Sequence, residues 1–303
     1  MSRQVTLAHA LTVSAIALAF SVSAQASASR TFVSTSGSDA NTASNCSASA
    51  NCRSFGAALS VTNSGGEVVV LTSGGYGPAS ITQPVVISAI GIDASISVTT
   101  AGNGITVSAG ATAAVTLNGL NLHGEATGTN GINVTSVGFL RLYNVLIENF
   151  TVNGVNFNTN GKLAIYGSNI NDNTNDGLLI QNASASAYVH NTSFDNNGNG
   201  VEVSAGAATV ADSDAHYNQT NAFLADGGTL TLFNDRAIFN ASALTTSAAA
   251  ASKLYFGNCL ISNNTTSYNV GAGSTLAGTN PGTSMIAPNQ ATNGTLSTAI
   301  NLQ

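Results

Sequence analysis

The sequence is poor in charge. Only 7% of its 303 residues are Asp, Glu, Lys or Arg, Lys and Arg together number 7, and the formal net charge is −6. Proteins that bind nucleic acid present clustered basic residues to the phosphates, so this composition argues against a nucleic-acid partner. The same shortage of basic residues argues against attraction to an anionic membrane surface.

The sequence also lacks a long apolar run, except near its N-terminus. Residues 10–22 are largely apolar and uncharged, Arg3 precedes them, and Ala24 and Ala26 supply small residues at the cleavage positions of a signal peptide. The run is too short to span a membrane comfortably. We therefore expect residues 1–26 to be a signal peptide, and the mature protein to be secreted or periplasmic with no membrane insertion.

Cysteine is rare, with 3 in the chain. Cys46 and Cys52 lie close together near the mature N-terminus, and export permits disulfides, so we expect a local disulfide between them. No His lies near this pair, which argues against a zinc site, and no metal site is predicted. Cys259 is left over and is expected to be a buried structural thiol.

A repeat of 21 to 25 residues organises the rest of the chain. A short alternating segment recurs at this spacing and ends at an anchor position, namely Gly119, Asn144, Gly167, Asn191, Asp212, Asn234 and Asn258. A second alternating segment precedes most anchors, and a third, shorter one follows them. Short alternating strands joined by Gly- and Asn-rich turns predict a solenoid of β-strands.

A second column of Asn indicates how the coils stack. It contains Asn173, Asn197, Asn218, Asn240 and Asn264. Residues one coil apart lie about 4.8 Å apart, so stacked amides can hydrogen-bond, and Asn tolerates the left-handed conformation of tight corners. We predict an all-β fold, a right-handed parallel β-helix of about nine coils. A leucine-rich repeat is disfavoured because the segments between strands are too short for a helical side.

The open end of a solenoid needs a cap. Residues 54–61 predict a short helix with Phe55, Ala58 and Leu59 on one face, ended by Gly65 and Gly66. We therefore expect an N-terminal strand and capping helix over residues 27–66, the β-helix over residues 67–273, and a C-terminal cap and tail over residues 274–303.

The N-terminal part carries a resemblance. Residues 31–39 (Thr-Phe-Val-Ser-Thr-Ser-Gly-Ser-Asp), the cap helix at 52–59 and the line from Gly66 to Tyr76 look like the opening of many secreted bacterial β-helix proteins. With the repeats, the likeness covers residues 30–264. On these segments the chain resembles the pectin-lyase-like right-handed β-helix superfamily, which includes lyases, hydrolases, tailspikes and adhesins. The resemblance implies the fold and no single activity.

One activity that the resemblance implies is polysaccharide lysis. The superfamily's lyases use a basic side chain or Tyr to abstract a proton, and Ca²⁺ or another cation to neutralise the uronate. Arg141 and Lys162 are the basic pair that adjacent coils could bring together, about 8 Å apart by strand spacing. The sequence shows no acidic cluster like the one that holds Ca²⁺ in the family's pectate lyases, so Ca²⁺ is expected only under this alternative and no cofactor otherwise.

Glycoside hydrolysis would need two carboxyl groups at a set separation. The motifs of the superfamily's polygalacturonases are absent. The remaining candidates are supported by position alone, and most lie in Asn-rich turns where Asp is a common structural substitute: Asp172, Asp195, Asp212 and Asp214. His123 and His216 have no recognisable catalytic partners and are interpreted as surface or turn residues.

Aromatic residues gather on one predicted outer face. The inward positions of the alternating strand are occupied by Leu140, Leu142, Leu163, Ile165, Val189, Leu230 and Leu232. The outward column reads Tyr143, Tyr166, His190, Ala211 and Phe233, with Arg141, Tyr188 and Tyr255 in the neighbouring column. Exposed aromatic rings can stack on sugars or bury against a partner, although aromatics also stabilise neighbouring strands.

We therefore predict a secreted, non-catalytic β-helix scaffold that binds a polysaccharide or cell-surface glycan through Tyr143, Tyr166, His190 and Phe233. The alternative is a carbohydrate-active enzyme, most plausibly a polysaccharide lyase that uses Arg141 and Lys162.

Overall fold

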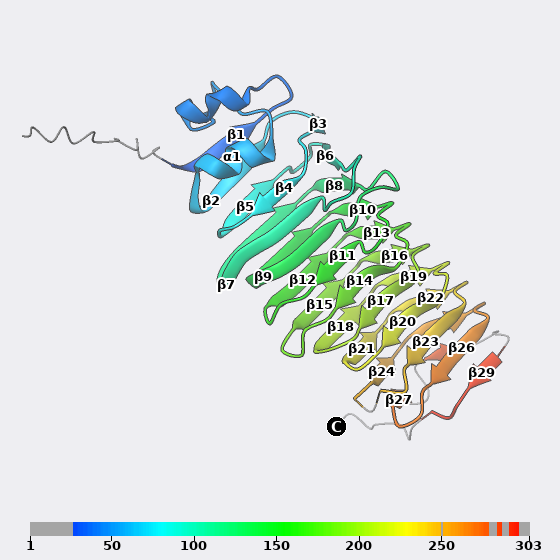
Figure 1. Ribbon diagram of the computed structural model, residues 1–303. Coiled ribbons are helices and arrows are strands. Elements are labelled where there is room, and N and C mark those ends of the chain that lie inside the picture. The colour runs from blue at the N-terminus through cyan, green and yellow to red at the C-terminus, as the bar shows by residue number, and fades with distance from the viewer. Residues whose placement is uncertain (1–26, 250, 279–283, 287–290, 297–303) are drawn as a thin grey trace, which may run out of the picture.

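The computed structural model is a right-handed parallel β-helix of about nine turns (Figure 1), which confirms the predicted fold class. It describes residues 27–249, 251–278, 284–286 and 291–296. The predicted signal peptide, residues 1–26, lies outside the described residues. Among the residues that the structure describes, no helix is long and apolar enough to cross a membrane.

The chain passes through three parallel ladders in each turn. The first contains β4 (Ala79–Ile81), β7 (Ile105–Asn118), β9 (Ile132–Tyr143), β11 (Val155–Phe157), β14 (Asp176–Ile180), β17 (Asn199–Val203), β20 (Asn221–Ala225), β23 (Ser242–Thr246), β26 (Thr266–Val270) and β29 (Ala291–Asn293). The second contains β1 (Ala28–Val33), β2 (Thr62–Val70), β5 (Val85–Ser88), the later halves of β7 and β9, β12 (Lys162–Tyr166), β15 (Ser186–His190), β18 (Ala207–Ala211), β21 (Thr229–Phe233), β24 (Lys253–Gly257) and β27 (Thr275–Gly278). Because β7 and β9 run through both, these two ladders form one 19-stranded sheet.

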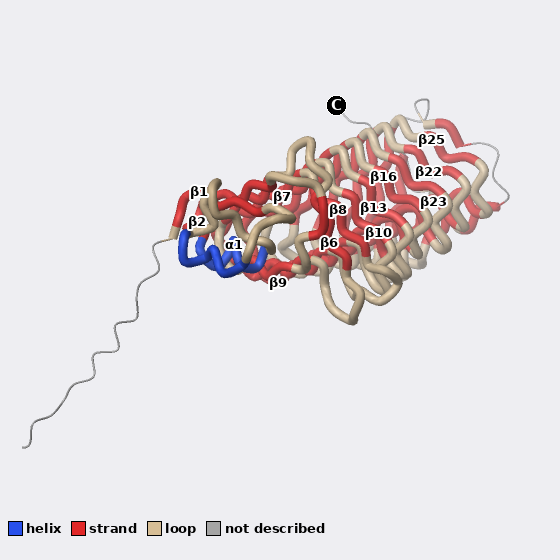
Figure 2. Tube along the Cα trace, turned by 90° about the horizontal axis from the view of Figure 1, so that it is seen from above, coloured by secondary structure: helices blue, strands red, loops and turns tan. Residues whose placement is uncertain are grey.

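The third ladder is a separate 10-stranded sheet of short strands, which Figure 2 shows one behind another. It contains β3 (Gly74–Gly75), β6 (Ala94–Ser97), β8 (Leu120–His123), β10 (Leu146–Glu148), β13 (Asn169–Asn171), β16 (Ser193–Asp195), β19 (Asp214–His216), β22 (Arg236–Ile238), β25 (Leu260–Ser262) and β28 (Met285–Ile286). Its central residues, such as Phe194 and Ala215, point inward and are fully buried, so the flanking residues of each strand face outward.

The core is a stack of aliphatic side chains from all three ladders. All of the residues predicted to point inward are at most 2% exposed, namely Leu140, Leu142, Leu163, Ile165, Val189, Leu230 and Leu232. Each such side chain contributes roughly 1.5–3 kcal/mol by leaving water. The alternating pattern therefore fixes which side chains are left outside for function.

A short helix caps the N-terminal end. α1 (Phe55–Val61) begins after Ser54, whose hydroxyl accepts a hydrogen bond from the Ala57 amide, and it buries its apolar face against the first coils. The expectation that Gly65 and Gly66 end this helix is wrong. The helix ends at Val61, and both glycines lie within β2, where Gly65 has a φ of 79°.

The loop between Cys46 and Cys52 covers the free edge of β1. The structure joins the two cysteines in a disulfide. The Phe32 amide donates to the Cys46 carbonyl at 2.8 Å, the Cys52 amide donates to the Phe32 carbonyl at 2.9 Å, and the Ser34 amide donates to the Cys52 carbonyl at 3.0 Å. A short 3-10 helix, η1 (Asp39–Ser44), precedes this loop and was not predicted. The disulfide loop thus pairs edge groups that would otherwise be open to another strand.

Strands continue beyond residue 273, in the segment predicted to be a C-terminal cap and tail. β27 pairs with β24, β28 with β25 and β29 with β26, all in parallel. The backbone ladders thus continue where the sequence repeat fades.

The two Asn columns stabilise turns in different ways. At the anchor positions, from Gly119 to Asn258, φ lies between 50° and 73°, the left-handed region that Gly and Asn adopt with least strain. The second column is buried: Asn218 Nδ2 donates to Asn240 Oδ1 at 2.9 Å, and Asn218 Oδ1 accepts from the Asn197 amide at 3.0 Å. Here the left-handed residue is the one before the Asn, namely Asp172, Asn196, Tyr217, Phe239 and Asn263.

Candidate functional site

Outward side chains of β9, β12 and β15 form an aromatic cluster on the second ladder. Tyr143, Tyr166 and His190 are successive partners in register. The rings of Tyr143 and Tyr166 are stacked, with centroids 5.2 Å apart and planes 10° apart. The Tyr188 ring lies 6.0 Å from that of Tyr166 and 6.2 Å from that of His190. We call these four residues the aromatic face.

Phe233 does not belong to the aromatic face. Ala211 stands between His190 and Phe233 in register, so Phe233 lies two coils beyond His190. The Phe233 side chain is 56% exposed. Of the binding residues predicted from the sequence, the structure therefore brings Tyr143, Tyr166 and His190 together and leaves Phe233 apart from them.

The predicted basic pair lies on the same outer surface, arranged around Phe139. Lys162 is the register partner of Phe139, and Arg141 is the register partner of Ala164. The guanidinium carbon of Arg141 lies 3.7 Å from the centroid of the Phe139 ring, which is a cation–π contact. The Arg141 guanidinium therefore packs against the Phe139 ring, while Lys162 is exposed to solvent.

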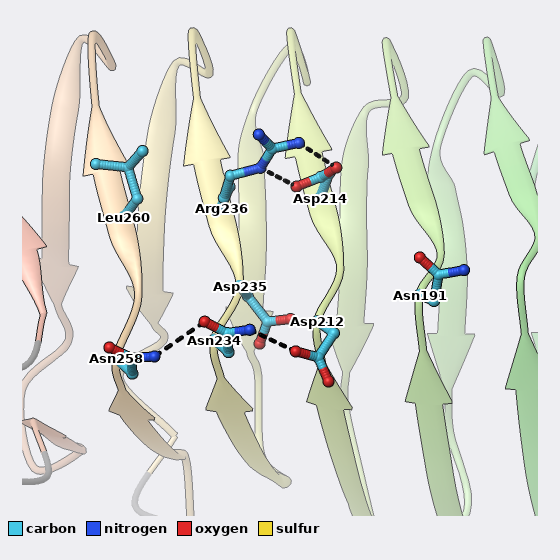
Figure 3. Close-up of a pocket in the computed structure, with 8 residues that line it drawn as sticks. All are labelled: Asn191, Asp212, Asp214, Asn234, Asp235, Arg236, Asn258 and Leu260. Atoms are coloured by element: carbon cyan, nitrogen blue, oxygen red, sulfur yellow. Dashed lines mark hydrogen bonds and ion pairs between the residues drawn. The ribbon is translucent and has the colours of Figure 1, made fainter.

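The aromatic face adjoins a cleft at the corner between the second and third ladders, and Figure 3 shows the residues that line this cleft. His190 makes the connection, because its Nε2 lies 3.1 Å from Asp212 Oδ2 in the next coil. The cleft has a volume of about 420 Å³ and is lined by Asn191, Asp212, Asp214, Asn234, Asp235, Arg236, Asn258 and Leu260.

Polar side chains in the cleft are tied to one another across coils, as Figure 3 shows. Asn258 Nδ2 donates to Asn234 Oδ1 at 2.9 Å, and Asn234 in turn donates to Asp212. The Arg236 guanidinium donates to both oxygens of Asp214, and these hydrogen bonds raise the pKa of Arg236. Arg236 and Asp214 therefore form a bidentate salt bridge.

Asp235 is the buried carboxyl group of the cleft. Its side chain is 1% exposed, and it accepts hydrogen bonds from the amides of Ser213 at 2.8 Å and Phe233 at 2.9 Å. Burial is the main cause that raises the pKa of Asp235 to about 7. The charges of Asp212 and Asp214 contribute to this rise, and the hydrogen bonds from the two amides oppose it. Sequence analysis missed this residue. A signal was present, because Asp235 directly follows an anchor position where the two preceding coils carry Thr192 and Ser213.

The third ladder carries two His–carboxylate pairs on its outer face. His123 Nδ1 lies 2.9 Å from Glu148 Oε1, and His216 Nδ1 lies 3.4 Å from Asp195 Oδ1. Burial alone would raise the pKa of Asp195, but hydrogen bonds from His216 and Ser193 outweigh it and lower the pKa. The interpretation of both His as residues without partners is therefore wrong. Each pair is separated by one anchor spacing, 25 and 21 residues, so aligning the coils would have found it.

A second group of carboxyls lies on the first ladder, away from the cleft. Asn199 Nδ2 donates to Asp176 Oδ1 at 2.9 Å and to Glu202 Oε2 at 3.0 Å. Burial and the charges of Asp176 and Asp226 raise the pKa of Glu202 to about 7. Burial also raises the pKa of Asp176.

Comparison with known proteins bears on this architecture. A sequence model described as the right handed beta helix region matches residues 87–238. No curated protein matches the sequence. Among solved structures, pectate lyase Pel9A is 14% identical, with a TM-score of 0.55 over 86% of this chain and 79% of that one. The A-module of mannuronan C-5 epimerase AlgE6 from Azotobacter vinelandii is also 14% identical, with a TM-score of 0.26 over 78% of this chain and 88% of that one.

At these identities the solved structures show the fold alone. The family match is the stronger finding, because residues 87–238 make up half of the chain and contain the aromatic face and most of the cleft. The chain belongs to the right-handed β-helix family.

Proposed function

We propose that the mature protein is an exported scaffold that binds a glycan chain on the aromatic face and in the adjoining cleft, without cleaving it. The observation that carries this proposal is the contact between His190 and Asp212, which makes the stacked rings and the polar cleft one continuous surface.

The chemistry of this surface suits a sugar chain. Sugars present apolar C–H faces beside rows of hydroxyl groups, so they fit aromatic rings that adjoin planar hydrogen-bonding groups. Tyr143, Tyr166 and Tyr188 supply the rings, while Asn234 and Asn258 supply amides at the edge of the cleft. The pectate lyase with a similar fold takes a polysaccharide by its name, which supports this ligand class by analogy.

The double variant Tyr143→Ala/Tyr166→Ala tests the proposal. Each stacking ring is worth roughly 0.5–1.5 kcal/mol beyond its buried area, so we expect retention on a bound polysaccharide to weaken roughly tenfold. The measurement is affinity electrophoresis against a panel of polysaccharides. Ile90→Ala is the control, because it removes a 74% exposed apolar side chain two coils before Tyr143 and outside the aromatic face. Retention that is unchanged in the double variant would remove the aromatic face from the proposal.

The non-catalytic part needs its own assay, because Arg141 and Lys162 share the outer surface with the aromatic face. Purified protein is incubated with acidic polysaccharides, with and without Ca²⁺, and unsaturated products are followed by absorbance. We expect none, since the Arg141 guanidinium is engaged by the Phe139 ring. Turnover that disappears in Arg141→Ala or Lys162→Ala would establish the lyase alternative instead.

A further inference from the structure

Two aromatic residues occupy turn positions that disfavour them. The left-handed residues that follow the third ladder are Asn or Asp in most coils, but Tyr217 has a φ of 55° and Phe239 a φ of 61°. Asn adopts this conformation readily, whereas a bulky side chain adopts it at a cost in free energy. Two aromatic residues therefore occupy neighbouring turns despite the backbone strain there. Their rings are exposed, so burial in the core does not offset this strain.

The two rings form an exposed stacked pair. Tyr217 is 59% exposed and Phe239 49% exposed. Their centroids lie 5.2 Å apart and their planes differ by 6°. The turns on either side carry the shorter Asn196 and Asn263. The side-chain amide of Asn196 donates to Asp172 in the preceding coil and not to the Tyr217 ring. Because neither flanking side chain is large enough to cover a ring, the outer face of each ring is left open to a ligand.

The pair borders the same outer face as the cleft. On β19, Asp214 and His216 point outward before Tyr217, and on β22, Arg236 and Ile238 point outward before Phe239. The His216 ring meets the Tyr217 ring edge-on, with centroids 6.5 Å apart. A strip across two adjacent coils therefore runs from the polar cleft, over the pair of Asp214 and Arg236 (Figure 3), to the two exposed rings.

We propose that Tyr217 and Phe239 form a second sugar-binding site, which stacks on a ring of a neutral glycan lying across β19 and β22. This inference rests on the proposed function for its ligand class and adds the site and the charge of the sugar. A neutral sugar follows from the charges on the strip. Arg236 is engaged by both oxygens of Asp214, while Asp195 and Asp212 add negative charge, so the carboxylate of a uronate would meet repulsion.

The test replaces both rings with the residue that the other turns use. In Tyr217→Asn/Phe239→Asn the strain is relieved, so we expect the melting temperature to rise by roughly 2–4 °C per position. We expect retention on neutral polysaccharides, such as galactomannan and mixed-linkage glucan, to fall at least tenfold. Tyr217→Phe and Phe239→Tyr keep the rings and should retain binding. A purely structural role for the rings predicts the opposite signs, a lower melting temperature with unchanged retention.

The outcomes separate this site from the aromatic face. If the wild type binds neutral glycans and the double Asn variant binds them equally well, the second site is refuted while the proposed function stands. Retention on pectate that falls in the double Asn variant as far as retention on neutral glycans does would refute the assignment of a neutral sugar. If the wild type is retained by no polysaccharide in the panel, both proposals fail.

Discussion

Replacing Asp235 with Ser should remove a pH-dependent loss of stability from the turn between β21 and β22. Asp235 takes the position that Ser213 holds one coil earlier, inside the turn. There the Ser213 hydroxyl accepts from the Thr192 amide at 3.1 Å and donates to the Ala211 carbonyl at 2.8 Å. Ser at position 235 can accept from the Ser213 amide in the same way, so the substitution changes the charge and keeps the main turn contact.

The sign of the effect follows from proton binding. The pKa of Asp235 is raised from 3.8 to about 7 in the folded protein. Between these values the folded protein keeps a proton that the unfolded chain has lost, so the free energy of unfolding falls as pH rises, by about 1.4 kcal/mol per pH unit. Over about three units the loss is about 4 kcal/mol. Above the folded pKa the group is ionised in both states, and the loss stays constant.

The Ser variant is therefore less stable than the wild type at low pH and more stable at high pH. It loses the hydrogen bond from the Phe233 amide to the carboxyl group, which costs about 1 kcal/mol. We expect it to be less stable by about 1 kcal/mol near pH 4 and more stable by about 3 kcal/mol near pH 8. Urea unfolding followed by far-ultraviolet circular dichroism measures both, since the chain has no Trp. Asp93→Ser, at an exposed carboxylate in an early coil, is the control. Parallel pH profiles for Asp235→Ser and the wild type would refute a buried carboxyl with a raised pKa.

Two further experiments test the scaffold. Asn218→Ala should lower the free energy of unfolding by roughly 3 kcal/mol or more. It takes the partner from the buried Asn197 amide and removes the hydrogen bonds to the Phe194 carbonyl and to Asn240. Asn234→Ala in the exposed anchor column should cost only about 1 kcal/mol, and equal losses in urea unfolding would contradict this difference. Cys46→Ala/Cys52→Ala should cost about 2 kcal/mol, as expected for a short disulfide loop, and should speed hydrogen exchange at the Phe32 and Ser34 amides; unchanged exchange there would show that the loop does not protect the edge of β1.

The repeat made the fold predictable because one coil specifies the next. The alternating strand from Leu230 to Phe233 predicts which residues are buried, and the anchor Asn234 after it predicts where the chain turns. The aromatic face follows from the same register, since Tyr143 and Tyr166 hold equivalent positions. What the repeat could not give is the direction in which a side chain leans. The Tyr166 ring lies closest to that of Tyr143, at 5.2 Å, and farther from those of Tyr188 and His190, and nothing in the sequence specifies this arrangement.

The residues that sequence analysis overlooked are those that break the repeat. The left-handed turn before Asn218 was hidden because Tyr217 is a residue type that rarely adopts positive φ. Asp235 was hidden because burial, which the neighbouring coils determine, changes an ordinary surface residue into a group with a raised pKa. Propensity arguments describe the average coil and fail where a residue departs from it.

Several of these departures lie on two adjacent coils. Asp235 replaces Ser or Thr, Tyr217 and Phe239 replace Asn, and Arg236 forms its pair with Asp214, all on β19, β22 and the turns that flank them. A coil that served only to extend the stack would do so most stably with the residues that other coils use at the same positions. The strained rings and the buried acid lower the stability of these two adjacent coils, which suggests a role other than folding. Because all of them border one outer strip, that role is best sought in a ligand that spans both coils.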